Sequence, residues 1–526
     1  MSGSTLVEWR EWSEATFAEA KAKNKPVLLG ISAVWCHWCH VMDHGIPGDP
    51  IHTGVYSDPQ IANYINEHFI PIRVDNDQRP DINARYNMGG WPTTCFLTPD
   101  GDVLYGATYL APSHMRAILP RIVSAWHTGR EEILRQIAEA AGQAEARKRT
   151  PAPADAPLQQ LANVAEDVWR AVITRIVRNY DRRHGGLGEG QKFPMSDVWA
   201  LLIAEHLRSK EPLMLDLALR TLVAMGTGGM YDRVAGGWFR YSTTPDWSVP
   251  HFEKMLEDHA RLLPVYAQAI ACCRKLGRQE EVRTLSSVVE SALDYLLSTL
   301  LRDTPSLVYF AGSQDADEHY YMLSRLERAK LTPPFIDWRL YADWNALMVS
   351  ALLHVAAMLE RPALAALAER IWDTLVRYTL QSDGSVIHSL IPDGDCMRPS
   401  SLVGVLADQA ALLQACLDVA QCRPSRAAQA MRVASQVWGY VCSALQAEDG
   451  GFYDVPPRQD ALGMLRVRIK PLADNAALAA ALAQWSSLTD DVSLREAAAA
   501  ALCAFLNEYP RYGEHAAPFA LAVWRA

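Results

Sequence analysis

The chain has 526 residues, which is too long for a single hydrophobic core and predicts two or more domains. A composition of 49% hydrophobic and 21% charged residues is that of a globular protein, and the formal net charge of −10 disfavours nucleic acid and anionic membranes as partners. The opening "MSGSTLVEWREWSEATF" lacks a basic stretch followed by an apolar core, so no signal peptide is expected. Ten cysteines without such a signal favour a reducing compartment, and we expect a cytoplasmic protein with no membrane span.

Residues 1–127 mix strand and helix patterns. "PVLLGIS" (26–32) and "IPIRVD" (70–75) are short apolar runs typical of buried parallel strands, and Asp58 is placed to cap the helix "DPQIANYINEHF" between them. "TTCFLTPDGDVLYG" (93–106) predicts two strands joined by a Pro-Asp-Gly turn. This order of strand, helix, strand and hairpin predicts an α/β domain.

The segment 128–157 separates this domain from the rest of the chain. We expect a polar helix over 129–148, followed by "TPAPADAPLQQ" (150–160), a Pro/Ala-rich linker. The composition changes beyond it, which makes this linker the clearest domain boundary in the sequence.

Residues 158–526 consist mainly of long amphipathic segments rich in alanine and leucine, with almost no strand signals. Asp343, Asp408 and Asp474 each stand at the start of such a segment and recur about every 65 residues, with Gly-Gly turns between the segments. A repeat of this length predicts six helix hairpins closed into an (α/α)6 toroid, whereas open solenoids usually have shorter periods. Aspartates at helix starts are most often N-caps, and we interpret these three in that way first.

The stretch "AVWCHWCHVMDH" (33–44) contains a Cys-x-x-Cys motif at a predicted helix start directly after a strand. The partial positive charge of a helix N-terminus stabilises a thiolate, so Cys36 is expected to attack and Cys39 to resolve, with His37 favouring the thiolate further. We expect Cys36 to be the more exposed and more acidic of the two thiols. Pro92 directly precedes a strand and is predicted to follow a cis peptide bond facing the cysteine pair. Trp35 and Trp91 flank these elements and join Pro92 as candidate substrate-binding residues.

Three alternatives for the motif remain open. "CHWCH" also fits the attachment pattern of c-type haem, which normally requires export. Cys36, Cys39, His40 and His44 are a set of zinc-ligand types. The two cysteines also fit a purely structural role. The favoured interpretation needs no metal and no cofactor.

In the second half, "YSTTPDWSVPHFEKMLEDHA" (241–260) carries the densest set of chemically active side chains. His251 and Glu253 are candidate catalytic residues, since an imidazole and a carboxylate beside a cavity can move protons on a sugar ring. Other acidic, basic and aromatic residues are candidate ligand contacts around the same cavity. These are Asp232, Trp238, Arg240, Tyr241, Trp247, Asp258, Asp315, Asp317 and Asp343. The alternative for the tryptophans is a place in the core, and for His251 and Glu253 a structural hydrogen bond.

Five stretches of the chain closely resemble the spermatogenesis-associated thioredoxin-domain family. They are "CHWCHVMDH", "VDNDQRPDINARY", "GGWPTTCFLTPDG", "GGMYDRVAGGWFRYSTTPDWSVPHFEKMLEDHA" and "SQDADEHYY…DWNAL". The resemblance implies a thioredoxin-like domain followed by an (α/α)6 barrel similar to N-acylglucosamine 2-epimerases and six-hairpin glycosidases. It also implies a sugar-like ligand for the barrel.

Two functions follow as expectations, and a non-catalytic binding protein is a third alternative. The first is a thiol–disulfide oxidoreductase that acts on a protein dithiol or disulfide, with a barrel that binds or presents a substrate. The second is a carbohydrate-active enzyme, epimerase-like or glycosidase-like, whose thioredoxin-like domain is regulatory. The intact Cys-x-x-Cys motif favours the first, because no single pair of barrel carboxylates stands out in the sequence.

Overall fold

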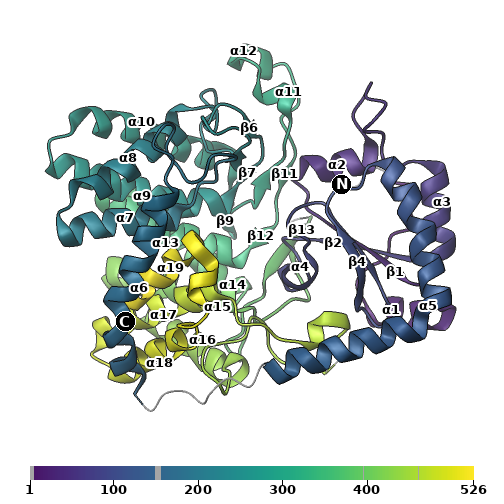
Figure 1. Ribbon diagram of the computed structural model, residues 1–526. Coiled ribbons are helices and arrows are strands. Elements are labelled where there is room, and N and C mark those ends of the chain that lie inside the picture. The colour runs from purple at the N-terminus through teal and green to yellow at the C-terminus, as the bar shows by residue number, and fades with distance from the viewer. Residues whose placement is uncertain (1–4, 148–155, 395, 460) are drawn as a thin grey trace. The chain divides into compact units, whose positions relative to one another are not determined.

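The computed structural model describes residues 5–147, 156–394, 396–459 and 461–526, and the chain divides into two compact units (Figure 1). One unit contains Met1–Pro151 and Pro457–Arg468, and the other contains Ala152–Pro456 and Ile469–Ala526. Most of the predicted linker, residues 150–155, lies outside the described residues. Among the residues that the structure describes, no helix is long and apolar enough to cross a membrane.

The first unit is built on a four-stranded sheet in the order β2-β1-β3-β4. Strands β1 (Val27–Ser32) and β2 (Ile70–Asp75) run parallel, while β3 (Thr93–Leu97) pairs antiparallel with both β1 and β4 (Val103–Ala107). The predicted strands and hairpin are therefore confirmed. A parallel pair needs a crossover connection, and helices α2 and α3 supply it between β1 and β2.

Helices cover both faces of this sheet. They are α1 (Glu14–Lys23), α2 (His37–His44), α3 (Pro59–His68), α4 (Pro80–Tyr86) and α5 (Pro112–Arg147). Asp58 caps α3 as predicted, because its side chain accepts the N–H groups of Gln60 and Ile61. Helix α5 begins at Pro112 rather than at residue 129, so that predicted start was wrong. The sequence pattern predicted a later start because Pro120, which lies inside the helix, is of a residue type that usually breaks helices.

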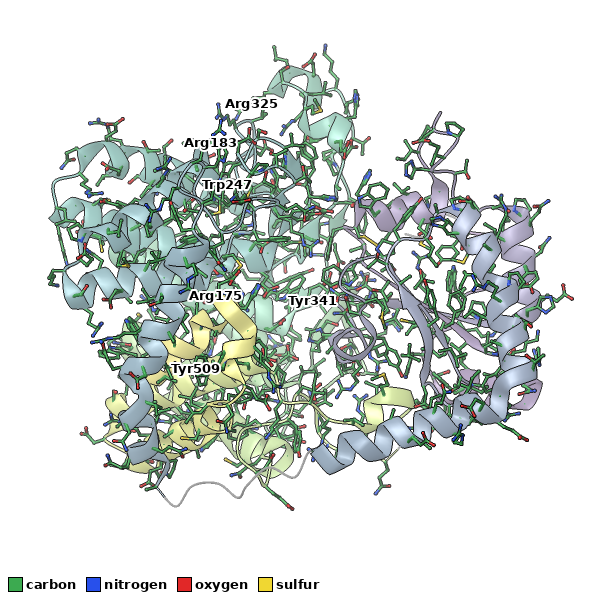
Figure 2. All side chains as sticks on the ribbon, in the orientation of Figure 1. Arg175, Arg183, Trp247, Arg325, Tyr341 and Tyr509 are labelled. Atoms are coloured by element: carbon green, nitrogen blue, oxygen red, sulfur yellow. A yellow bond between two sulfur atoms is a disulfide. The ribbon has the colours of Figure 1, made fainter. Side chains whose placement is uncertain are left out.

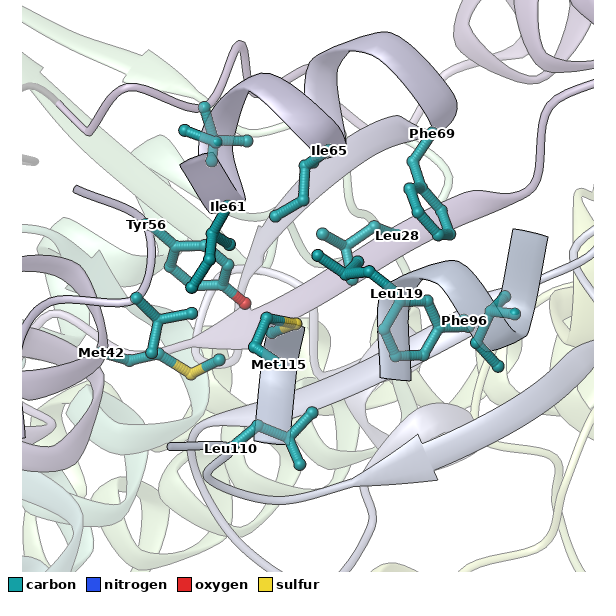
Figure 3. Packing of buried hydrophobic residues seen from close by; sticks show 14 residues of the cluster. Leu28, Met42, Tyr56, Ile61, Ile65, Phe69, Phe96, Leu110, Met115 and Leu119 are labelled. Atoms are coloured by element: carbon teal, nitrogen blue, oxygen red, sulfur yellow. The ribbon is translucent and has the colours of Figure 1, made fainter. Parts of the chain in front are cut away.

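Side chains alternate between two apolar clusters, one on each face of the sheet. On one face Leu28 and Phe96 pack with residues of α3 and α5, as Figure 3 shows. On the other face Val27, Leu29 and Ile72 pack with residues of α1 and α4. This is the alternation expected of strands buried on both faces.

The segment Pro457–Arg468 belongs to the first unit, although the sequence predicted the whole of 158–526 to form the barrel. It contains a short 3-10 helix, Gly463–Arg466, and inserts Leu465 into the apolar cluster under β2. The Tyr86 hydroxyl donates to the Gly101 carbonyl (2.7 Å) and accepts the Met464 N–H (2.7 Å). This apolar contact and the two hydrogen bonds hold the segment against the first unit.

The second unit is a closed ring of helix hairpins. The inner helices are α7 (Ser196–Ser209), α9 (Leu256–Lys275), α13 (Ala342–Met358), α15 (Leu406–Cys422), α17 (Leu472–Thr489) and α19 (Ala517–Arg525). The outer helices are α6 (Pro157–Asn179), α8 (Pro212–Thr227), α10 (Gln279–Tyr295), α14 (Pro362–Tyr378), α16 (Ala427–Tyr440) and α18 (Val492–Cys503). Each inner helix packs on the next and α19 packs back on α7, so the predicted toroid is confirmed.

Because an outer helix separates consecutive inner helices, the inner helices run parallel and their N-termini meet at one end of the ring. Short strands lead into these N-termini, with β7 (Lys254–Met255) directly before α9 and β12 (Leu340–Tyr341) directly before α13. The remaining strands are β5 (Tyr241–Ser242), β6 (Pro250–His251), β8 (Leu301–Asp303), β9 (Val308–Phe310), β10 (Ser313–Gln314), β11 (Ile336–Asp337), β13 (Ser389–Asp393) and β14 (Cys396–Pro399). Two short helices, α11 (Glu318–Tyr321) and α12 (Arg325–Arg328), lie between β10 and β11.

Candidate functional site

The cysteine pair lies where β1 leads into α2. Cys36 is the N-cap of α2, and its Sγ accepts the Cys39 N–H at 3.2 Å. The two sulfur atoms are joined in a disulfide. Cys36 is 4% and Cys39 2% exposed, so Cys36 is the more exposed of the two, as predicted, although both are buried. The helix N-terminus is nevertheless directed at the first sulfur, as the motif predicted.

Aromatic residues and a cis proline surround this pair. The Trp91–Pro92 bond is cis, as predicted, and β3 begins at the next residue. The rings of Trp35 and Trp91 meet edge to face at 5.7 Å. Trp35 is buried and donates its indole N–H to Asp77 (2.6 Å), whereas Trp91 is half-buried and donates to Asn83 (3.1 Å). Of the three predicted substrate contacts, Trp35 and Pro92 are buried, and Trp91 is therefore the one that solvent reaches.

In the barrel, four of the predicted residues come together on the hairpin β5–β6. His251 pairs with Tyr241 across the hairpin, and the two rings stack at 4.8 Å. His251 Nδ1 lies 2.8 Å from a carboxylate oxygen of Glu253, which is 1% exposed. The Arg240 guanidinium lies over the Tyr241 ring at 5.9 Å. The structure thus groups these side chains, with His251 and Tyr241 partly open to solvent.

Three other predicted ligand contacts lie in the core. Trp238 is fully buried and Trp247 is 1% exposed, and Trp247 donates its indole N–H to the His184 carbonyl among the side chains of this unit (Figure 2). Asp232 is buried and accepts from Lys254 (2.8 Å) and Arg328 (2.7 Å). Each of the three fills a core position, where Trp238 packs against the rings of Tyr231 and Tyr266, so their burial does not support the predicted ligand contact.

The two remaining predicted residues, Asp315 and Asp317, make separate local hydrogen bonds. Asp317 is exposed and caps α11 by accepting the Tyr320 N–H at 2.9 Å. Asp315 is half-buried, and its carboxylate accepts the N–H of the next residue at 2.7 Å. The capping role that aspartates most often play therefore applies to Asp317, for which a ligand contact had been predicted.

Acidic residues in the first turns of the inner helices line the end of the ring where the N-termini meet. Asp258 is on α9, Asp343 on α13, Asp408 on α15 and Asp474 on α17. We expected the last three to be N-caps, but Tyr341, Val405 and Pro471 hold those positions and no side chain caps these helices. The capping prediction was wrong because these aspartates stand one or two residues inside their helices.

Two of these aspartates, Asp343 and Asp408, lie close to the side chain of His388. His388 Nδ1 lies 3.1 and 3.0 Å from the two oxygens of Asp408, which is fully buried. The Asp343 N–H points to Asp408 at 3.3 Å. One ligand atom from each of the three side chains lies within 4.8 Å of the others, so within the described ranges this group has the spacing of a metal site. Sequence reasoning missed His388, which no motif marks.

The electrostatics of the ring end favour protonated carboxyl groups. Burial, followed by the neighbouring Asp408, raises the pKa of Asp343 to about 8. Burial and then Glu257 raise the pKa of Asp258 to about 7, against the opposing Arg240 and Arg261. Burial raises the pKa of Asp474 to about 6, with Arg261 opposing. All three side chains are partly exposed, so they combine proton affinity near neutral pH with access from solvent.

Arg261 is the arginine that opposes the raised pKa values of both Asp258 and Asp474. It lies on α9, one turn beyond Glu257, and donates its Nε–H to that carboxylate at 2.9 Å. Nothing in the sequence distinguished it, because an arginine at this helical spacing is usually a surface partner of the preceding glutamate. Its charge lowers the pKa of both Asp258 and Asp474, so one cation opposes the effect of burial on carboxyl groups of two different helices.

Comparison with known proteins agrees with this two-part structure. Residues 2–144 match the family model Thioredox_DsbH, described as "Protein of unknown function, DUF255". The chain is 31% identical to uncharacterized protein B0495.5 of Caenorhabditis elegans, over 50% of this chain and 36% of that protein. It is 30% identical to human spermatogenesis-associated protein 20, over 59% of this chain and 39% of that protein. The match thus spans less than two fifths of the length of these relatives.

Three further comparisons concern one part of the chain each. Over 19% of this chain, it is 30% identical to thiol:disulfide interchange protein DsbD 1 of Pseudomonas aeruginosa, covering 17% of that protein. The fold resembles a D-mannose isomerase (TM-score 0.53, 10% identity, 69% of this chain and 97% of the other). It also resembles the cellobiose 2-epimerase of Spirochaeta thermophila (TM-score 0.52, 14% identity, 70% of this chain and 96% of the other). These likenesses confirm the predicted fold class, a thioredoxin-like domain followed by an (α/α)6 toroid.

Proposed function

Because the chain is related to spermatogenesis-associated protein 20 and begins with a thioredoxin-like domain, we propose that it is a thiol–disulfide oxidoreductase acting through Cys36 and Cys39. The observation that carries the proposal is the position of Cys36. It caps α2 directly after β1, accepts the Cys39 N–H and is disulfide-bonded to Cys39. An N-terminal half-turn that donates to the sulfur stabilises its thiolate.

The exchange has two steps. In the reduced protein the Cys36 thiolate attacks a substrate disulfide, so that a Cys36–substrate bond forms and the first substrate thiolate leaves. Cys39 then attacks Cys36, the Cys36–Cys39 bond forms, and the second substrate thiolate leaves and takes a proton from solvent. Two electrons pass from the cysteine pair to the substrate, and the reverse sequence oxidises a substrate dithiol. The name of the Pseudomonas relative, a thiol:disulfide interchange protein, supports this class of substrate.

A single-turnover assay tests the proposal. Reduced protein is mixed with an aromatic disulfide whose thiolate absorbs visible light. Cys396 and Cys422 are exposed thiols that would add background, so both are first replaced by Ser. We expect two aromatic thiolates per chain in two phases, and neither phase in Cys36→Ser. If the Cys36→Ser variant released as much aromatic thiolate as the protein with Cys36 intact, the proposal would be refuted.

A second candidate function belongs to the barrel. Asp258, Asp343 and Asp474 combine solvent access with pKa values raised towards neutral, which suits general acid–base catalysis. We propose that this end of the ring isomerises or epimerises a sugar, with Asp343 donating a proton and the His251–Glu253 pair accepting one. The likeness to a D-mannose isomerase and a cellobiose 2-epimerase supports a sugar as the ligand.

Incubation with D-mannose or cellobiose, followed by chromatography of the products, tests this second function. Conversion should persist in Cys36→Ser and fall at least tenfold in Asp343→Asn and His251→Ala, since loss of a positioned acid or base typically costs about a hundredfold or more. Conversion that survives both barrel substitutions and fails in Cys36→Ser would exclude a barrel enzyme.

A further inference from the structure

The chain between β10 and β11 carries two short helices, α11 and α12, which stand beyond those strands at one end of the second unit (Figure 1). Among residues 322–333, all of which the structure describes, Arg328 is the one buried residue. We call residues 322–333 the strap. Met322 and Leu326 of the strap are 79% and 80% exposed, so apolar burial contributes little to its attachment. A charged side chain is therefore what holds the strap to the barrel.

Arg328 connects the strap to the barrel wall and to Tyr321. Its Nη1 donates to Asp232 at 2.7 Å. Its Nη2 donates to the carbonyl of Tyr321, and the guanidinium lies over the Tyr321 ring at 5.4 Å. The other arginine of the strap, Arg325, donates to the Val234 carbonyl at 3.1 Å, where solvent reaches the bond. Water replaces an exposed hydrogen bond at little cost, so Arg328 is the principal anchor.

Asp232, the partner of Arg328, is shared with a second buried cation. Lys254 is fully buried and donates to Asp232 at 2.8 Å, and its Nζ lies over the Tyr321 ring at 5.1 Å. Burial lowers the pKa of Lys254 to about 8, with Asp232 opposing this effect and Arg328 adding to it. Two cations therefore compete for one carboxylate. Because Lys254 and Asp232 neutralise each other, Arg328 can withdraw to solvent without leaving a buried carboxylate unpaired.

Tyr321 links the strap to the candidate catalytic pair of the barrel. Its ring is buried and lies parallel to the Phe252 ring, with the two centroids 5.9 Å apart. Phe252 stands between His251 and Glu253 in the chain, so a fixed Phe252 ring restricts the backbone that carries both. A continuous line of contacts thus runs from Arg328 through Tyr321 and Phe252 to the pair.

We propose that Arg328 is a positioning residue: it holds the strap on the barrel, and the docked strap keeps the His251–Glu253 pair in place. Lys254 weakens this hold, because it repels Arg328 and competes with it for Asp232. In the docked state two cations share one carboxylate, and in the released state Lys254 and Asp232 form a neutral pair. The role in positioning rests on the second proposed function, the sugar reaction, whereas the docking of the strap does not.

Substitutions of the two cations change strap docking in opposite directions. Trypsin cleaves after Lys330 only when the strap leaves the barrel, so the cleavage rate reports the released fraction. Arg328→Met removes the anchor and should speed this cleavage, whereas Lys254→Met removes the competing cation and should slow it. Charges at hydrogen-bond range change an equilibrium by about tenfold, and we expect changes of that order in each direction.

Two further variants separate the anchor from the rest of the strap. Arg325→Met removes the arginine whose bond is exposed to solvent, and it should leave cleavage after Lys330 at the wild-type rate. Arg328→Lys keeps a cation for Asp232 but has no second donor group for the Tyr321 carbonyl, so its rate should fall between those of wild type and Arg328→Met.

Modification by diethyl pyrocarbonate, located by peptide mass, measures the placement of the pair without requiring any activity. His251 is half-buried, with Nδ1 2.8 Å from Glu253. Its modification should be faster in Arg328→Met and unchanged in Arg325→Met, and the exposed His515 serves as the internal reference. In the sugar assay Arg328→Met should lower kcat more than it changes KM, because it displaces catalytic groups.

Faster cleavage and faster His251 modification in Arg328→Met, with slower cleavage in Lys254→Met, support the inference. Faster cleavage in both variants, or unchanged cleavage in Arg328→Met, would overturn it. If Lys254→Met does not fold, equal cleavage of Arg328→Met and Arg325→Met is the result that contradicts the anchor. Faster cleavage without faster His251 modification would disprove the positioning role. Absence of sugar conversion in the wild type would instead refute the second proposed function, and neither of these two rates depends on it.

Discussion

At the scale of single residues, the aspartates of the barrel show what sequence can and cannot tell. Asp343, Asp408 and Asp474 were recognisable from their recurrence at helix starts, but the default interpretation as N-caps was wrong. A shift of two or three residues separates the N-cap position from these aspartates, and no pattern fixes helix ends that finely. His388 and Arg261 gave no sequence signal, since their roles depend on partners distant along the chain.

The raised pKa of Asp343 predicts a pH-dependent stability. An unfolded Asp ionises near pH 4, whereas the folded Asp343 keeps its proton up to about pH 8. Between these values the folded chain binds more protons than the unfolded one, so the free energy of unfolding falls as pH rises. We expect Asp343→Asn to remove this fall. At alkaline pH the free energy of unfolding of the variant should exceed that of the wild type by about 1 to 2 kcal/mol. This is less than the full pKa shift would give, because the carboxyl is partly solvated.

Thermal melting of the two proteins across this pH range checks the expectation. The difference in Tm should be smallest near pH 4 and should grow through pH 8, where Asp343 finally ionises. Asp317→Asn, at an exposed cap, is the matched control and should give no such trend. An Asp343→Asn variant that is less stable than the wild type at every pH would contradict the pKa assignment.

At the scale of elements, local chemistry predicted most of the first unit. Asp58 caps α3, the apolar runs 27–32 and 70–75 form parallel strands, and a Pro-Asp-Gly turn joins β3 to β4. Helix α5 was the exception, because Pro120 interrupts its sequence pattern while the surrounding turns remain helical. The strands of this unit and the Asp58 cap depend on neighbouring residues, so sequence specifies them well, whereas a tolerated proline depends on packing.

The segment Pro457–Arg468 is attached to the first unit by contacts that one substitution can weaken. Tyr86 is fully buried, and its hydroxyl bonds both the Gly101 carbonyl and the Met464 N–H. Tyr86→Phe leaves these two groups without their partner, which should cost about 2 kcal/mol of stability. We also expect faster tryptic cleavage within the segment, at Arg458 or Arg466.

Urea denaturation and limited proteolysis measure these two effects. Tyr105→Phe removes a hydroxyl from a side chain that is 41% exposed, and it should change neither the midpoint nor the cleavage rate. Equal behaviour of the two variants would mean that the Tyr86 hydroxyl does not hold the segment.

At the scale of the whole molecule, repetition was the decisive sequence signal. Segments recurring about every 65 residues predicted hairpins, and closure followed because inner helices of this kind bury their apolar faces only against neighbours on both sides. The contacts of α19 with α7 close the ring as expected. The insertion of residues 457–468 into the first unit was not predictable, because it depends on long-range packing and on Tyr86, far away in sequence.

The central claim is that Cys36 and Cys39 form an exchanging pair, and trapping a mixed disulfide tests it most directly. The Cys39→Ser variant, in the background without Cys396 and Cys422, is incubated with a peptide disulfide and analysed by intact mass and peptide mapping. We predict one adduct per chain, located at Cys36 and released by added dithiol, and no such adduct in Cys36→Ser or in the wild type after turnover. An adduct that forms at a buried barrel cysteine instead, or no adduct at Cys36 at any pH, would contradict the claim.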